Sequence, residues 1–131
     1  MSMRIDKENL EPTLREHVEN WLKETAEDSY DGDQEAVYRD LMKGGCQSGM
    51  VGHLIYYNDT LAFYQHYQED IGKLLYQTKE STGLSIEELF GEKWDRHDPL
   101  ARETTNQNLL AWFGFEETAR IIMEEERGVE L

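Results

Sequence analysis

The residues best suited to chemistry lie between positions 44 and 67, in the stretch GGCQSGMVGHLIYYNDTLAFYQHY. Its single cysteine, Cys46, combines with His53 and Asp59 to offer a nucleophile, a base and an orienting carboxylate. A helix that begins after Gly45 would also lower the pKa of the thiol. However, seven residues of helix rise by about 10 Å, which is too far for Cys46 and His53 to share a hydrogen bond. We therefore predict no catalytic residue and interpret Cys46 as a small buried side chain.

Four glycines in the same stretch raise the question of a phosphate-binding loop. They are Gly44, Gly45, Gly49 and Gly52. No Gly-Lys-Ser/Thr sequence follows them and no strand is predicted before them, as a phosphate loop would require. The chain also has no Lys or Arg from Gly44 through Ile71 to balance a phosphate. We interpret the first two glycines as a helix stop and the other two as sites of close helix packing.

Metal binding is the next possibility, because His66 stands three and four residues before Glu69 and Asp70. This is helical spacing, but the Glu-x-x-His motif of a di-iron bundle is absent. Helical carboxylates such as Glu16, Glu19 and the run 124–126 could hold Mg²⁺ together with substrate phosphates. They fall mostly on polar helix faces, which favours a solvated surface. We predict no metal and no cofactor, with a metal-dependent nucleotide hydrolase as the alternative.

Charge is the strongest global feature of the chain. Its 131 residues carry 28 Asp and Glu against 13 Lys and Arg, a formal net charge of −15. Residues 1–43 and 84–131 contribute −6 and −7, whereas residues 44–83 contribute only −2. Such a chain repels nucleic-acid phosphates and anionic membranes, so we expect neither as a direct partner. It is instead steered toward basic protein surfaces, and the charge exceeds the magnitude of about 2–8 typical of soluble small domains.

Helical patterns dominate the sequence. Thr13 and Glu16 form a capping box for a helix to about residue 27, and Asp33 caps a second helix that ends at Gly44. We expect a short buried helix over 48–58, although a strand is also permitted there. A long helix should then run from Asp59 or Thr60 to Gly83. The pattern further predicts a short helix over 86–90, an irregular segment over 91–103 around Pro99, and a last helix from Thr104 to Gly128.

These elements predict one all-α domain over residues 1–131, with five or six helices around an aromatic, glycine-containing central hairpin. One cysteine, no leader and no apolar run of 18 residues favour a cytoplasmic protein. Five tyrosines lie within residues 56–76. We expect Tyr57, Tyr64 and Tyr67 to pack in the core with hydroxyls reaching its polar edge, and Tyr56 and Tyr76 to be exposed for binding.

Three motifs resemble an uncharacterised domain family of small proteins from bacteriophages and mobile elements. They are Gly-Cys-x-Ser-Gly-Met-Val at 45–51, Tyr-Tyr-x-Asp-Thr-x-x-Phe-Tyr at 56–64, and Ala-Trp-Phe-x-Phe-Glu-Glu at 111–117. Together they cover a third to a half of the chain. Gly114 stands where the pattern has a larger residue. The resemblance implies a phage or prophage setting, an all-α fold and, if phage-encoded, action in the host cytoplasm, but no established activity.

The hypothesis that follows is a non-enzymatic inhibitor of a host-defence nucleic-acid-binding complex, of anti-CRISPR or anti-restriction type. Its carboxylates would mimic phosphates in a basic groove. The second hypothesis is the nucleotide hydrolase, and the third is an assembly protein that forms a homodimer through its aromatic middle. The partner-binding residues predicted for the inhibitor are Glu24, Glu27, Asp28, Asp31, Asp33, Glu116, Glu117, Glu124, Glu125, Glu126, Tyr56 and Tyr76.

Overall fold

The computed structural model describes residues 10–42, 59–90 and 99–131, and for residues 59–61, 99–105 and 108 it describes the backbone only. These ranges contain six α-helices, a final π-helical segment and no strand, which confirms the predicted all-α class. The helix predicted over 48–58 lies outside the described residues. The glycines at 44, 45, 49 and 52 also lie outside them, as do Cys46, His53, Tyr56 and Tyr57.

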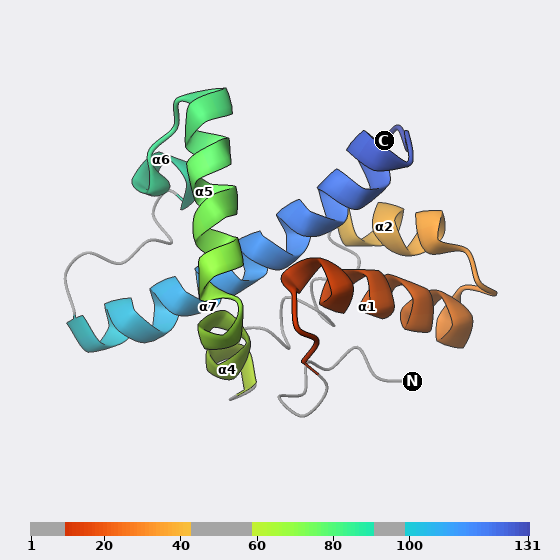
Figure 1. Cartoon of the computed structure of the whole chain (residues 1–131), viewed down its shortest axis with the longest axis horizontal. Coiled ribbons are helices and arrows are strands. Elements are labelled where there is room, and N and C mark those ends of the chain that lie inside the picture. The colour runs from red at the N-terminus through yellow and green to blue at the C-terminus, as the bar shows by residue number, and fades with distance from the viewer. Residues whose placement is uncertain (1–9, 43–58, 91–98) are drawn as a thin grey trace.

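Helices α1 (Leu14–Ser29) and α2 (Gln34–Met42) form an antiparallel pair (Figure 1). The predicted cap is confirmed, because the Thr13 hydroxyl accepts a hydrogen bond from the Glu16 amide at 3.1 Å. Both helices bury one apolar face, with Val18 and Leu22 of α1 and Val37 and Tyr38 of α2 fully buried. Burial of these faces, rather than helix propensity, stabilises such short helices.

Helix α7 (Pro99–Arg120) runs through the centre of the molecule and packs against α1, α4 (Asp59–His66) and α5 (Gln68–Thr82) (Figure 1). The short helix α6 (Ile86–Phe90) lies beside the far end of α5. At the centre, the rings of His17, Trp21 and Phe63 pack around Phe115. The Tyr67 ring packs in turn against His17 and Phe63, and centroid separations between neighbouring rings are 4.9–6.2 Å. Edge-to-face packing of this kind adds to the stability gained from burial.

Two predicted boundaries are wrong. The single helix expected from residue 59 or 60 to Gly83 is divided at Tyr67, whose side chain turns into the core and whose backbone has φ −105° and ψ 19°. The last helix begins at Pro99 rather than Thr104. Proline has no amide hydrogen to lose and its φ suits the first helical turn, so Pro99 begins a helix instead of lying in an irregular segment.

The end of the last helix also differs from a regular α-helix. Residues Ile121–Glu126 (η4) form a π-helical segment in which the Arg127 amide reaches back five residues to the Ile122 carbonyl at 3.1 Å. Gly128 then ends the helix as predicted, with a left-handed φ of 73°. The wider turn keeps both Ile122 and Met123 buried against the core.

Candidate interaction surface

Five of the predicted partner-binding carboxylates come together where α1 passes into α2. Glu24, Glu27 and Asp28 lie on the last two turns of α1, and Asp31 and Asp33 lie in the turn that follows. All five residues are exposed. We call this group the acidic edge. Positions 24, 27 and 28 share one helix face, so three carboxylates stand within about 6 Å of helix rise.

The local backbone explains why the turn carries aspartates. Asp31 has a left-handed φ of 52°, and Gly32 follows with a φ of 82°. The Gly32 amide donates to the Ala26 carbonyl at 2.8 Å, which closes the helix end. Asp and Asn adopt left-handed geometry more readily than other residues with a side chain. The Asp33 carboxylate then accepts from the Ala36 amide at 3.2 Å and caps α2.

The acidic edge lacks balancing charge in the part of the chain that the structure describes. No ion pair joins any of its five carboxylates to a described Lys, Arg or His. The last turn of α1 contains no basic residue, so Glu27 and Asp28 face the negative end of the helix dipole. Acidic side chains there cost about 0.3–1 kcal/mol each. This arrangement is unfavourable for the isolated fold.

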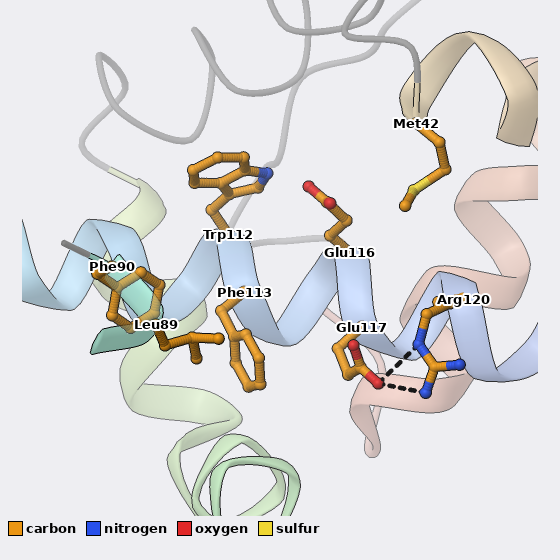
Figure 2. A pocket seen from close by; sticks show the side chains of 8 residues that line it. All are labelled: Met42, Leu89, Phe90, Trp112, Phe113, Glu116, Glu117 and Arg120. Carbon is orange, nitrogen blue, oxygen red and sulfur yellow. Dashed lines mark hydrogen bonds and ion pairs between the residues drawn. The ribbon is translucent and has the colours of Figure 1, made fainter. Parts of the chain in front are cut away.

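The second predicted acidic group, near the end of the chain, is partly paired with internal arginines. Arg120 donates to Glu117 and to Glu125, each at 2.9 Å, and Figure 2 shows the first of these contacts. Arg15 forms a two-hydrogen-bond ion pair with Glu126. These carboxylates raise the pKa of both guanidinium groups, and the Arg15 contact lowers the pKa of the Glu126 carboxyl. Three of the five predicted carboxylates here are therefore paired.

The remaining two members of that group are partly buried. The Tyr38 hydroxyl donates to Glu124, and burial together with this bond raises the pKa of Tyr38. Burial also raises the pKa of the Glu116 carboxyl, an effect that the Trp112 indole opposes and the Glu117 charge adds to. The sequence predicted a solvated surface for the run 124–126, and Glu124 differs from that prediction because it is partly buried against Tyr38. The Glu117–Arg120 spacing of three residues was the signal that could have identified the pairing.

The two tyrosines predicted to bind a partner, Tyr56 and Tyr76, have different outcomes. Tyr56 lies outside the described residues. Tyr76 is 67% exposed on α5, where it lines a shallow groove with Leu84 and Ile86. Helix α5 lies left of centre in Figure 1 and the α1–α2 turn lies at the right-hand end, so Tyr76 and the acidic edge do not form one surface. Of the tyrosines expected in the core, Tyr67 is 1% exposed and Tyr64 is partly buried.

The residues considered for a metal site have structural partners instead. His66 Nε2 lies 2.8 Å from the Glu11 carbonyl oxygen, and Asp70 accepts a hydrogen bond from the Leu14 amide at 3.0 Å. Within residues 10–42, 59–90 and 99–131, no group of three or more His, Cys, Asp or Glu residues could hold a metal ion. Among the helices in these ranges, none is long and apolar enough to cross a membrane.

Comparison with known protein families gives a match over most of the chain. A family described as a domain of unknown function, DUF7222, matches residues 13–127, from the cap of α1 to the end of η4. No curated protein and no solved structure matches the chain.

Proposed function

The chain belongs to the DUF7222 family, and we propose that it is a phage-derived inhibitor that binds a basic, nucleic-acid-binding surface of a host-defence complex. The complex would be a CRISPR effector or a restriction enzyme, and the inhibitor would act in the host cytoplasm without catalysis. One observation supports this function above the alternatives. The acidic edge concentrates five exposed carboxylates that have no described cationic partner.

The contrast with the end of the chain strengthens this proposal. If the surface carboxylates served only solubility, it would not matter which of them form ion pairs. Here Arg15 and Arg120 form ion pairs with three of the carboxylates near the end of the chain. The acidic edge has no ion pair with a described residue, and its Glu27 and Asp28 stand at an unfavourable helix end. A charge arrangement that costs stability is typical of a surface kept for binding. We therefore narrow the proposed contact surface to the acidic edge.

The density of charge also suits a phosphate-binding groove. Phosphates of one DNA strand recur about every 3.4 Å along the axis. Glu24, Glu27 and Asp28 present three carboxylates within about 6 Å of helix rise, and the turn adds two more. A groove lined with Lys and Arg to hold a DNA backbone would thus meet a similar row of negative charges. Long-range attraction by the net charge of −15 would speed the encounter.

The test is displacement of DNA from purified CRISPR effectors and restriction enzymes. We expect the wild-type protein to displace target DNA from at least one complex, with an association rate that falls as salt rises. The triple variant Glu24→Gln, Glu27→Gln, Asp28→Asn should associate about tenfold more slowly, because steering charge is lost. A control variant with the same charge change, Glu69→Gln, Glu80→Gln, Glu130→Gln, removes exposed acids from other elements and should associate close to the wild-type rate.

Circular dichroism of each variant establishes that it is folded. Binding that neither salt nor the triple variant changes would reject the acidic edge as the contact surface. Equal slowing by the two triple variants would show that only total charge matters, which also contradicts the proposal.

A further inference from the structure

A pocket of about 230 Å³ lies beside the middle of α7, and none of its lining residues belongs to the acidic edge. Its apolar wall comes from three elements, α2, α6 and α7 (Figure 2). The wall residues are Met42, Leu89, Phe90, Trp112 and Phe113. The Phe90 and Phe113 rings meet edge to face, with centroids 6.1 Å apart. Three aromatic side chains therefore line a small, mostly apolar space.

One carboxylate at this pocket differs from its neighbours. Glu116 stands on the same side of α7 as the Trp112 indole, between it and Met42 (Figure 2). Arg120 lies one helical turn away, yet it donates to Glu117 and Glu125 and forms no ion pair with Glu116. Burial raises the pKa of the Glu116 carboxyl, which is the expected response of a charge without a nearby cation. In the described part of the chain, Glu116 is a partly buried acid that has the Trp112 indole beside it and no cationic partner.

We propose that this pocket binds a small organic ammonium ion, with the charged group on Glu116 and the apolar body against Trp112, Phe113 and Leu89. The combination of a carboxylate with aromatic walls is the chemistry that recognises organic cations, because ring faces attract positive charge. The carboxylate would gain a cationic partner, which none of the described residues provides. The site is separate from the acidic edge, and the proposal does not depend on the inhibitor function.

Size and charge restrict the ligand further. Pockets for drug-sized ligands measure about 300–1,000 Å³, so this one accommodates a body about the size of one aromatic ring with a short chain. Its charged residues are Glu116, Glu117 and Arg120, which leaves one net negative charge when all are ionised. An organic anion would meet this charge and the net charge of −15, and a neutral ligand would leave Glu116 unpaired.

The experiment is a titration of isotope-labelled protein with 2-phenylethylamine, followed by nuclear magnetic resonance. The neutral analogue 2-phenylethanol and the anion 3-phenylpropionate serve as comparison ligands of similar shape. We expect 2-phenylethylamine to shift the Trp112 indole signal and the backbone signals of Phe113 and Glu116. The alcohol should bind at least about tenfold more weakly, because hydrogen bonds to charged groups are stronger than neutral ones.

Two variants locate the site. Glu116→Gln keeps the size of the side chain, removes its charge, and should weaken binding of 2-phenylethylamine about tenfold or more. Glu130→Gln removes one exposed acid elsewhere and should bind as the wild type does. Leu89→Trp fills the pocket without altering Glu116, and we expect it to abolish binding. It provides an independent test if Glu116→Gln fails to fold.

Three results would overturn the proposal. They are no shift at Trp112, Phe113 or Glu116 with 2-phenylethylamine, equal affinity for the alcohol, and unchanged affinity in Glu116→Gln. Because none of these measurements uses a DNA-binding complex, failure of this site and failure of the inhibitor function are distinguishable.

Discussion

The Tyr67 hydroxyl satisfies both backbone groups of Glu11. It accepts a hydrogen bond from the Glu11 amide and donates one to the Glu11 carbonyl, each at 2.8 Å. Tyr67 stands at the junction of α4 and α5, 56 positions from Glu11 in the sequence. The Leu14 amide donates to Asp70 at 3.0 Å in the same region. These bonds attach the segment before α1 to the start of α5.

Removal of this hydroxyl should destabilise the protein. We expect Tyr67→Phe to lower the free energy of unfolding by about 1–3 kcal/mol, because the part-buried Glu11 amide loses its partner and the Glu11 carbonyl keeps only its contact with His66. Urea denaturation measures the change. Tyr64→Phe is the matched control, because Tyr64 packs against the core and its hydroxyl has no hydrogen bond with any described residue. A loss below about 0.5 kcal/mol in Tyr67→Phe would contradict the structural role of these bonds.

Gly114 permits the close approach of α5 to α7. A Cβ atom added there would lie 2.6 Å from Ile71 Cγ1 and 3.4 Å from Leu14 Cδ2. We expect Gly114→Ala to lower the free energy of unfolding by about 1–2 kcal/mol, because overpacking outweighs the helix propensity that alanine gains. Gly72→Ala is the control on α5, where nothing lies within 4 Å. The Gly72→Ala substitution should raise the free energy of unfolding by about 0.5–1 kcal/mol. If Gly114→Ala also stabilised the protein, α5 and α7 would lie farther apart than described.

His17 should make stability depend on pH. Burial among Phe63, Tyr67 and Phe115 lowers its pKa from 6.5 to about 4, and the nearby His66 adds to this shift. The folded state therefore prefers the neutral ring. As pH falls below about 6.5, His17 takes up a proton in the unfolded chain but stays neutral in the folded chain. The free energy of unfolding therefore decreases between about pH 6.5 and pH 4. Over this range the free energy of unfolding should decrease by about 3 kcal/mol.

The comparison for this prediction is His17→Leu, whose stability should lack that component of the pH dependence. Urea denaturation of both proteins across this pH range gives the difference. Glu116 has the opposite effect on the pH dependence, because its raised pKa favours the folded state in acid. Both proteins contain Glu116, so its effect cancels in the difference. His66→Gln is the control, since His66 is exposed and its removal should leave most of the slope. Parallel pH profiles for the wild type and His17→Leu would contradict the assignment.

Neutralising the two acids of the acidic edge that lie in the last turn of α1 should stabilise the fold. Glu27→Gln and Asp28→Asn remove negative charge from the last turn of α1. Each should raise the free energy of unfolding by about 0.3–1 kcal/mol at low salt. Glu69→Gln acts in the first turn of α5, where an acid is favourable, and should lose a similar amount. Thermal denaturation at two salt concentrations measures both effects, which should shrink as salt rises. Destabilisation by the two α1 variants would contradict the view that these acids are unfavourable for the fold.

The sequence by itself determined the helical class, most caps and one acidic group. Short-range patterns carry this information: Thr13 with Glu16, Asp31 with Gly32, and the apolar face of α1 all act within a few residues. The five carboxylates of the acidic edge also lie within ten positions, so their exposure and proximity follow from one helix face and one turn. Their number and helical spacing needed no knowledge of distant residues.

Only the tertiary structure decided which acids keep their charge unpaired. Glu126 meets Arg15, and Glu124 meets Tyr38, across separations of 111 and 86 positions. The helix break at Tyr67 depends likewise on burial of that ring and on its bonds to Glu11. Such contacts depend on how α1, α2 and η4 pack together, and helical periodicity specifies each face without specifying its partner. Arg120 pairs with Glu117 and Glu125 rather than with Glu116 for the same reason.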